Sequence, residues 1–253
     1  MEDRVIHYHG LPITPASAAI SAVGGGHAFV SFRYPDQLGL VLEVCQSFAV
    51  DNGAFSAWKS GEPVTDWSRY YAWVADLHRY PNFDFAVIPD VIDGDEQAND
   101  DLLAEWPWRG TAKGGSVGAP VWHMHESIDR LQRLANDWPR ICIGSSGEFA
   151  TVGDSRWWSR MADAMNSITD KQGIPVTKIH GLRMLNTEVF SRLPLASADS
   201  TNIAQNIGID SKWRGTYTPA SKESKAKVMR ERIEIVQALT FWDKQAIQME
   251  LAA

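Results

Sequence analysis

Three aspartates close short apolar runs of this sequence, and their side chains are the best suited to chemistry. Asp51, Asp90 and Asp199 each stand at the end of such a run. A buried carboxylate is costly unless a partner holds it or a reaction uses it. Carboxylates serve as nucleophiles and as general acids or bases, so these positions indicate acid–base or covalent catalysis. The alternative for Asp199 is that it only caps the helix expected near 203–207.

Polar residues close further apolar runs in the same way. His123, His125 and His180 lie at or near the ends of two of them, and Gly144-Ser145 follows another. If the runs are parallel strands of one barrel, the loops after them share one face, where chemistry gathers. We therefore expect the acids and histidines to converge on one mouth.

Eight apolar runs can form the strands that carry these residues. They lie at 5–10, 27–32, 47–51, 83–90, 119–125, 140–144, 176–181 and 193–199. Segments of helix length separate most of them, which predicts parallel strands and a single (β/α)8 TIM barrel. We place the barrel at about 5–205 and a basic helical C-terminal extension at about 206–253, in one domain over 1–253. An open, doubly wound sheet is the structural alternative.

Composition describes an ordinary globular protein. The chain has 253 residues, 44% of them hydrophobic, and a net charge of −7. No apolar run reaches the roughly 18 residues that a membrane span needs, and the N-terminus lacks a signal-peptide core. Cys45 and Cys142 both sit inside apolar runs, where they are expected as core residues rather than as metal ligands or a disulfide. These features predict a cytoplasmic protein without membrane contact.

Positive charge is concentrated near the C-terminus. The segment 212–232 holds seven basic and two acidic residues, a net charge of +5, which leaves −12 for the remainder. A basic face on an acidic body suits a localised phosphate contact. The residues expected to bind nucleic acid are Lys212, Arg214, Lys222, Lys225 and Lys227. The alternative is a solvated helix face.

Short motifs around the strand ends resemble the tRNA-guanine transglycosylases. The stretch 50–55, Val-Asp-Asn-Gly-Ala-Phe, is similar to their Asp-Ser-Gly-Gly-Phe motif. The stretch 143–148, Ile-Gly-Ser-Ser-Gly-Glu, resembles their glycine-rich base-binding loop, and 180–182 and Asp199 follow in the family's order. The resemblance covers about 5–205 and implies a (β/α)8 barrel.

Departures from the family's pattern narrow the resemblance. Two cysteines cannot form the family's structural zinc site, so no metal and no cofactor is expected. The usual Gln-Gly pair is replaced by Trp122-His-Met-His125, and the chain is shorter than typical members. It therefore looks more like the compact phage-type DNA-guanine transglycosylases, which put 7-deazaguanine bases into DNA.

The resemblance implies a role for each candidate residue. Asp199 would be the nucleophile and Asp51 the general acid and base. Asp90 would bind the base edge, with His123 or His125 in place of the missing Gln. The remaining substrate-binding set is Asn52, Phe55, Gly144, Ser145 and His180.

The expected partners are DNA or RNA and a 7-deazapurine base, and a homodimer is left open. Two other functions fit the same residues. One is a glycoside or nucleoside hydrolase on the same barrel, because water can replace the incoming base. The other is a non-catalytic barrel that binds nucleic acid through its basic segment.

Overall fold

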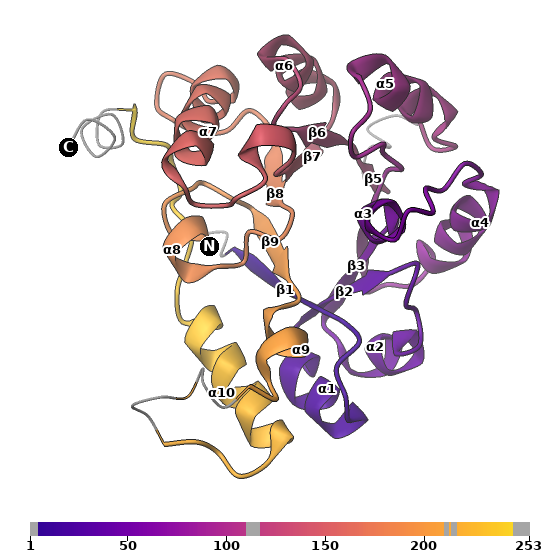
Figure 1. Cartoon of the computed structure of the whole chain (residues 1–253), viewed down its shortest axis with the longest axis vertical. Helices are drawn as coiled ribbons and strands as arrows, with labels where there is room; N and C mark the ends of the chain where they lie inside the picture. The colour runs from indigo at the N-terminus through magenta and orange to yellow at the C-terminus, as the bar shows by residue number, and fades with distance from the viewer. Residues whose placement is uncertain (1–4, 110–116, 210–212, 214–216, 245–253) are drawn as a thin grey trace.

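Nine parallel strands form one sheet in the computed structural model, which describes residues 5–109, 117–209, 213 and 217–244 (Figure 1). Their order is β5-β4-β3-β2-β1-β9-β8-β7-β6. The strands are β1 (Ile6–Gly10), β2 (His27–Ser31), β3 (Ser47–Asp51), β4 (Phe83–Val87), β5 (Gly118–Ala119), β6 (Val121–His123), β7 (Arg140–Gly144), β8 (Lys178–Gly181) and β9 (Ser197–Ser200).

The two edges of this sheet belong to one stretch of chain. β5 pairs with β4 and β6 pairs with β7, and Pro120 alone separates β5 from β6. Proline has no N–H to donate, so a regular ladder cannot run through it. The carbonyl oxygen of Pro120 accepts from the Cys142 N–H at 2.8 Å, on the β7 side. The chain thus crosses from one edge to the other and closes the sheet, which confirms the expected (β/α)8 barrel.

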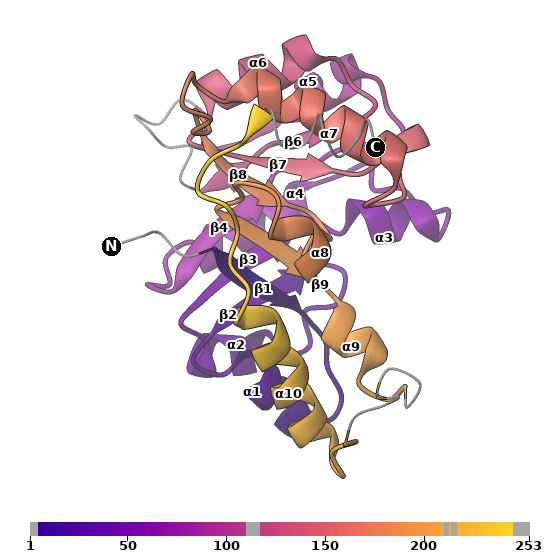
Figure 2. The same ribbon diagram turned by 90° about the vertical axis from the view of Figure 1, so that its left-hand side faces the viewer.

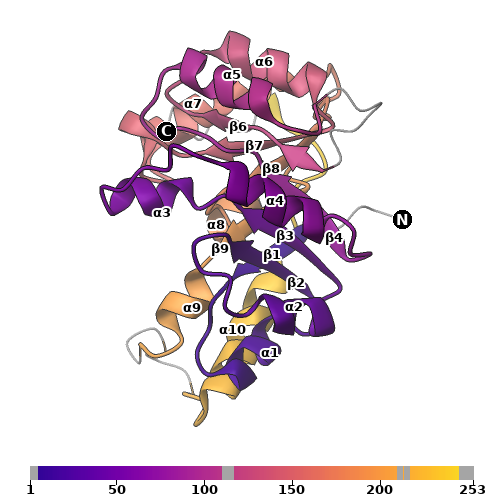
Figure 3. The same cartoon turned by 90° about the vertical axis from the view of Figure 1, so that its right-hand side faces the viewer.

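Helices surround the barrel, and all but the last two, α9 and α10, connect one strand to a later one. They are α1 (Ala16–Val23), α2 (Leu38–Val44), α3 (Ala54–Lys59), α4 (Ser68–Leu77), α5 (Glu96–Glu105), α6 (Ile128–Asp137), α7 (Ser155–Ile168), α8 (Thr187–Phe190), α9 (Asn202–Asn206) and α10 (Lys222–Glu234), with a 3₁₀ turn, η2 (Gly147–Phe149). Side chains cap several of them: Asp95 accepts from the Ala98 N–H, Ser127 from Arg130 and Asp154 from Trp157. The short helices α3, α8 and α9 lie on one side of the sheet, where the strands end (Figures 2 and 3).

Two apolar layers hold the barrel together. The larger lies between strands and helices and includes fully buried Trp122 and Trp157. The smaller fills the interior, where the rings of Tyr8, Phe29 and Phe85 meet. Such packing leaves no pore, so any site must lie at an end of the barrel.

A polar group closes the end of the barrel where the strands begin. Tyr8 donates its hydroxyl to Asp84 at 2.5 Å, and Arg140 pairs with Asp84 at 2.9 Å. The Arg140 guanidinium lies 4.3 Å from the centre of the Phe85 ring. These contacts fill the end where the strands begin, so a ligand can enter only at the end where the strands finish.

The structure differs from the sequence-based expectation in several bounds. The predicted strand at 119–125 ends at His123 and is broken at Pro120, and the strand predicted at 193–199 runs from Ser197 to Ser200. The motif at 50–55 runs from the end of β3 into α3, with Gly53 as the N-cap at a φ of 81°. The C-terminal helix α10 packs against α1, as Figure 2 shows.

Candidate active site

A cavity of about 540 Å³ opens at the ends of the strands and collects most of the predicted residues. Those that line it are Asp51, Asn52, Phe55, Asp90, His123, Gly144, Ser145 and Asp199. They come from the ends of β3, β6, β7 and β9 and from the segments that follow β3 and β4. The expected convergence at one mouth is therefore present.

Asp199 is held in place by the segment that follows β8. It is 4% exposed, and its Oδ1 accepts from the Arg183 backbone N–H at 2.8 Å. His180 Nε2 lies 3.3 Å from the same oxygen, while His180 Nδ1 meets the Ser197 hydroxyl at 2.8 Å. In the described part of the chain no hydrogen bond is made to Oδ2. One carboxylate oxygen is thus fixed, and the other is available to a ligand.

His180 lies behind Asp199 rather than in the cavity wall. It is fully buried, and its ring contacts those of Phe29 and Phe85. Burial lowers the pKa of His180, against the raising effect of Asp199. The Ser197 hydroxyl holds the ring at Nδ1, and Nε2 lies against Asp199 without a well-aligned hydrogen bond. We therefore assign His180 the orientation of Asp199 instead of the direct substrate contact expected from the sequence.

Asp51 stands at the end of β3 with an unusual acidity. Its Oδ2 accepts from the Gly53 N–H at 3.0 Å and from the Ser31 hydroxyl at 3.3 Å. Burial, followed by the charges of Asp199 and Asp90, raises the pKa of Asp51 from 3.8 to about 7. A carboxyl group with this pKa exchanges its proton at neutral pH, which suits a general acid and base.

Asp90 forms a third acidic position with partners on both oxygens. Asn52 donates from Nδ2 to Oδ1 at 2.7 Å, and His123 Nε2 lies 2.9 Å from Oδ2. The Asn52 amide also bonds the Ile88 carbonyl oxygen at 2.9 Å, and its Oδ1 accepts from the Ala54 N–H. Asn52 therefore fixes the end of β4 against the start of α3.

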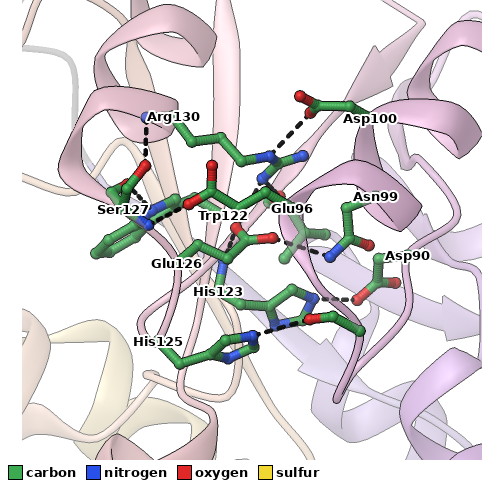
Figure 4. Close-up of polar contacts among 12 residues, drawn as sticks. Asp90, Glu96, Asn99, Asp100, Trp122, His123, His125, Glu126, Ser127 and Arg130 are labelled. Carbon is green, nitrogen blue, oxygen red and sulfur yellow. Dashed lines mark hydrogen bonds and ion pairs between the residues drawn. The ribbon is translucent and has the colours of Figure 1, made fainter.

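A buried ionic network supports the pair of Asp90 and His123 (Figure 4). Glu126 Oε2 accepts from the His123 backbone N–H at 2.8 Å and from Arg130 Nη1 at 2.7 Å. Its Oε1 accepts from Asn99 Nδ2 at 2.9 Å, and Asn99 Oδ1 accepts from the Val91 N–H at 2.7 Å. One carboxylate thus holds both the end of β6 and the loop after β4.

Sequence reasoning missed this network. Glu126 and Arg130 are buried at 2% and 1% exposure, and Arg130 also bonds Asp100 at 2.9 Å. The available signal was the spacing of four residues between an acid and an arginine at the start of a helix. That spacing is common on exposed helices, so the sequence alone does not mark the pair as buried.

Arg183 is a cavity residue that the sequence-based set did not contain. It lines the cavity, and its guanidinium carbon lies 3.9 Å from the centre of the Phe55 ring. Its Nη2 donates to the Ser145 carbonyl oxygen at 3.4 Å. The backbone φ of Arg183 is 57°, a left-handed value that is uncommon outside glycine.

His125, expected as a base contact, is not among the residues that line the cavity. It is exposed, and its ring nitrogens meet the Ser146 hydroxyl at 2.7 Å and the Gly94 carbonyl oxygen at 3.1 Å. Residues two apart point to the same face only within a strand, and β6 ends at His123. Of the two histidines, the structure therefore places His123 in the cavity wall.

The helix α10, which carries the described lysines of the basic segment, lies beside α1. Lys222 Nζ donates to the Thr14 carbonyl oxygen at 3.2 Å, and Lys227 lies 3.9 Å from Glu231. Lys225 is on the same helix, α10, whose first residues are near the start of α1. Lys212 and Arg214 lie outside the described residues. The helix therefore begins on the side of the barrel that carries the cavity.

The described residues contain neither a metal-binding cluster nor a membrane-spanning helix. No group of three or more His, Cys, Asp or Glu side chains there is placed to hold a metal ion. No helix in that part of the chain has the length and apolar character needed to cross a bilayer.

Comparisons with known proteins identify the fold but not a family. No protein-family model matches the sequence, and no curated protein matches it. A solved structure of a mutant tryptophan synthase alpha-subunit from the hyperthermophile Pyrococcus furiosus is similar, with a TM-score of 0.50. It shares 8% sequence identity, over 92% of this chain and 96% of that chain. This similarity supports the barrel and says nothing about the reaction.

Proposed function

We propose that this protein is a base-exchange transglycosylase that replaces guanine in nucleic acid, DNA first, with a 7-deazaguanine base. The observation that carries the proposal is one cavity with two unlike carboxyl groups. Asp199 is held at one oxygen, and Asp51 has a pKa of about 7. Transfer through a covalent glycosyl intermediate needs such a nucleophile and such a proton shuttle.

The proposed reaction has two displacements. Asp199 Oδ2 attacks C1′ of the nucleoside, the glycosidic bond breaks, and Asp51 gives its proton to the departing guanine. The incoming base then loses a proton to Asp51 and attacks C1′, which releases Asp199. Two inversions retain the configuration of the sugar, as in retaining glycosidases. The two steps balance in atoms and charge without a metal or a cofactor. The target nucleotide must leave its duplex to reach the cavity.

Base recognition is assigned to the wall formed by β6, β7 and the end of β4. Asp90 accepts from N1–H and the exocyclic amine, a donor pair that guanine and 7-deazaguanine share. Asn52 and His123 orient Asp90, and the Ser145 N–H donates to O6. Gly144 lines the same wall. The Phe55 ring offers a stacking surface.

A glycoside or nucleoside hydrolase is the second candidate. The same two carboxyl groups would serve it, with water in place of the incoming base. A non-catalytic nucleic-acid-binding barrel is the third, supported by the basic helix α10. In each case the cytoplasm is the expected compartment.

Incorporation of labelled guanine into DNA tests the proposal. The wild-type protein is expected to incorporate label and to give a denaturation-resistant adduct with single-stranded DNA. Asp199→Asn is nearly isosteric, so it should fold but lose both signals by at least about 10³-fold. Asp137→Asn, an exposed position on α6, is the control and should behave as wild type. Guanine release without incorporation would indicate a hydrolase, and an adduct in Asp199→Asn would remove Asp199 from its role.

A further inference from the structure

The mouth of the cavity holds a cation that the proposed reaction does not use. Arg183 is exposed and lines the cavity beside acids that lie deeper, with Asp199 at 4% and Asp90 at 8% exposure. A guanidinium has five N–H donors. Within the described part of the chain, it donates to one acceptor, the Ser145 carbonyl oxygen, and no carboxylate there forms an ion pair with it. Most of its donors therefore remain available to a ligand.

The guanidinium is held in one orientation. One face lies on the Phe55 ring at 3.9 Å, a cation–π contact that leaves the edge with its N–H donors free. The backbone beneath it has a φ of 57°, the one positive value of a non-glycine residue in the described chain. Backbone strain of this kind clusters at ligand-binding positions. The backbone N–H of Arg183 also bonds Asp199. One residue therefore connects the mouth of the cavity to the deeper carboxylate.

A second cation shares the rim. Lys59 is exposed and lines the cavity, four residues after Phe55 at the end of α3. The charges are therefore layered, with carboxyl groups at depth and two cations outside. A ligand that matches this order has an uncharged reacting centre inside and an anionic group at the mouth.

We propose that Arg183 binds a phosphate group of the ligand, assisted by Lys59, so that the cavity takes nucleotides in preference to nucleosides. Arginine pairs two oxygens of a phosphate at once, which fixes direction as well as charge. The choice of a nucleoside as the remainder of the ligand rests on the proposed function, whereas the phosphate site itself does not.

The test compares two probes, 2′-deoxyguanosine and 2′-deoxyguanosine 5′-phosphate, by calorimetry on the full chain. The wild-type protein is expected to bind the nucleotide at least about 10-fold more tightly, within the range of a charged hydrogen-bonded contact. Arg183→Gln should reduce the ratio to below about 2, while Arg183→Lys should give an intermediate ratio. The control is Arg133→Gln, an exposed arginine on α6, which should keep the wild-type ratio.

Two outcomes overturn the proposal. In the first, the wild-type protein shows no preference for the nucleotide, and this includes a protein that binds neither probe. In the second, the preference survives in Arg183→Gln. Its failure can be separated from failure of the base exchange. An Arg183-dependent preference without incorporation of guanine leaves the phosphate site standing. Incorporation by Arg183→Gln at the wild-type kcat/KM leaves the base exchange standing and removes the phosphate site.

Discussion

Replacing Asp51 by Asn should make the protein more stable at alkaline pH while it stops turnover. Burial and two neighbouring acids raise the pKa of Asp51 from 3.8 to about 7, so the folded state holds this proton more tightly than the unfolded chain. The stabilisation by the bound proton is complete below pH 3.8 and is lost as the pH rises to about 7. Above that pH, the contribution of Asp51 to the unfolding free energy no longer changes. A shift of this size removes about 3 kcal/mol of stability between pH 5 and pH 8. Asparagine does not titrate and escapes the loss.

The measurement is urea unfolding of the wild type and of Asp51→Asn at pH 5 and pH 8. We expect the difference in unfolding free energy between the two proteins to grow by about 3 kcal/mol over this interval in favour of the variant. Ser31 and Gly53 can still donate to the amide oxygen, so their bonds do not obscure the comparison. A difference that is the same at both pH values would show that Asp51 titrates normally. It would also remove the basis for its role as general acid near neutrality.

Two further variants, one single and one triple, test other parts of the structure. Glu126→Ala leaves Arg130 buried without one of its partners and should cost about 3–5 kcal/mol in urea unfolding, and a change below about 1 kcal/mol would contradict the network. Replacing Lys222, Lys225 and Lys227 together by Gln should lower the slope of log affinity for DNA against log salt by about two to three units. An unchanged slope would identify α10 as a solvated helix.

The sequence predicted the acids of the site because their position is unusual. Asp51, Asp90 and Asp199 each stand at the end of an apolar run. Parallel strands in a barrel bring these ends to one face, whatever the conformation of the loops. The fold was predictable because short apolar runs separated by segments of helix length can pack in only a few ways. His123 was assigned together with His125 because period-two spacing does not tell where a strand stops.

Roles that depend on distant contacts were not predictable. Arg183 reaches Phe55 across the mouth, and Glu126 bonds Asn99, 27 residues earlier in the chain. Neither contact leaves a local pattern, because each partner alone is an ordinary loop or helix residue. His180 shows the same limit: its place at a strand end was correct, but burial against Phe29 and Phe85 turns it toward Asp199 and away from the cavity.

The break at Pro120 has a consequence for how this chain could be re-engineered. The first and last strands, β1 and β9, are hydrogen-bonded neighbours, as in most closed barrels. The two outer strands of the sheet are β5 and β6, from the middle of the chain, and a covalent link one residue long joins them. A circular permutation that opens the chain at Pro120 and links the old termini would leave both strands as free edges. Such edges pair with other molecules, so the permuted protein should self-associate where a permutant opened in an exposed helix loop should not.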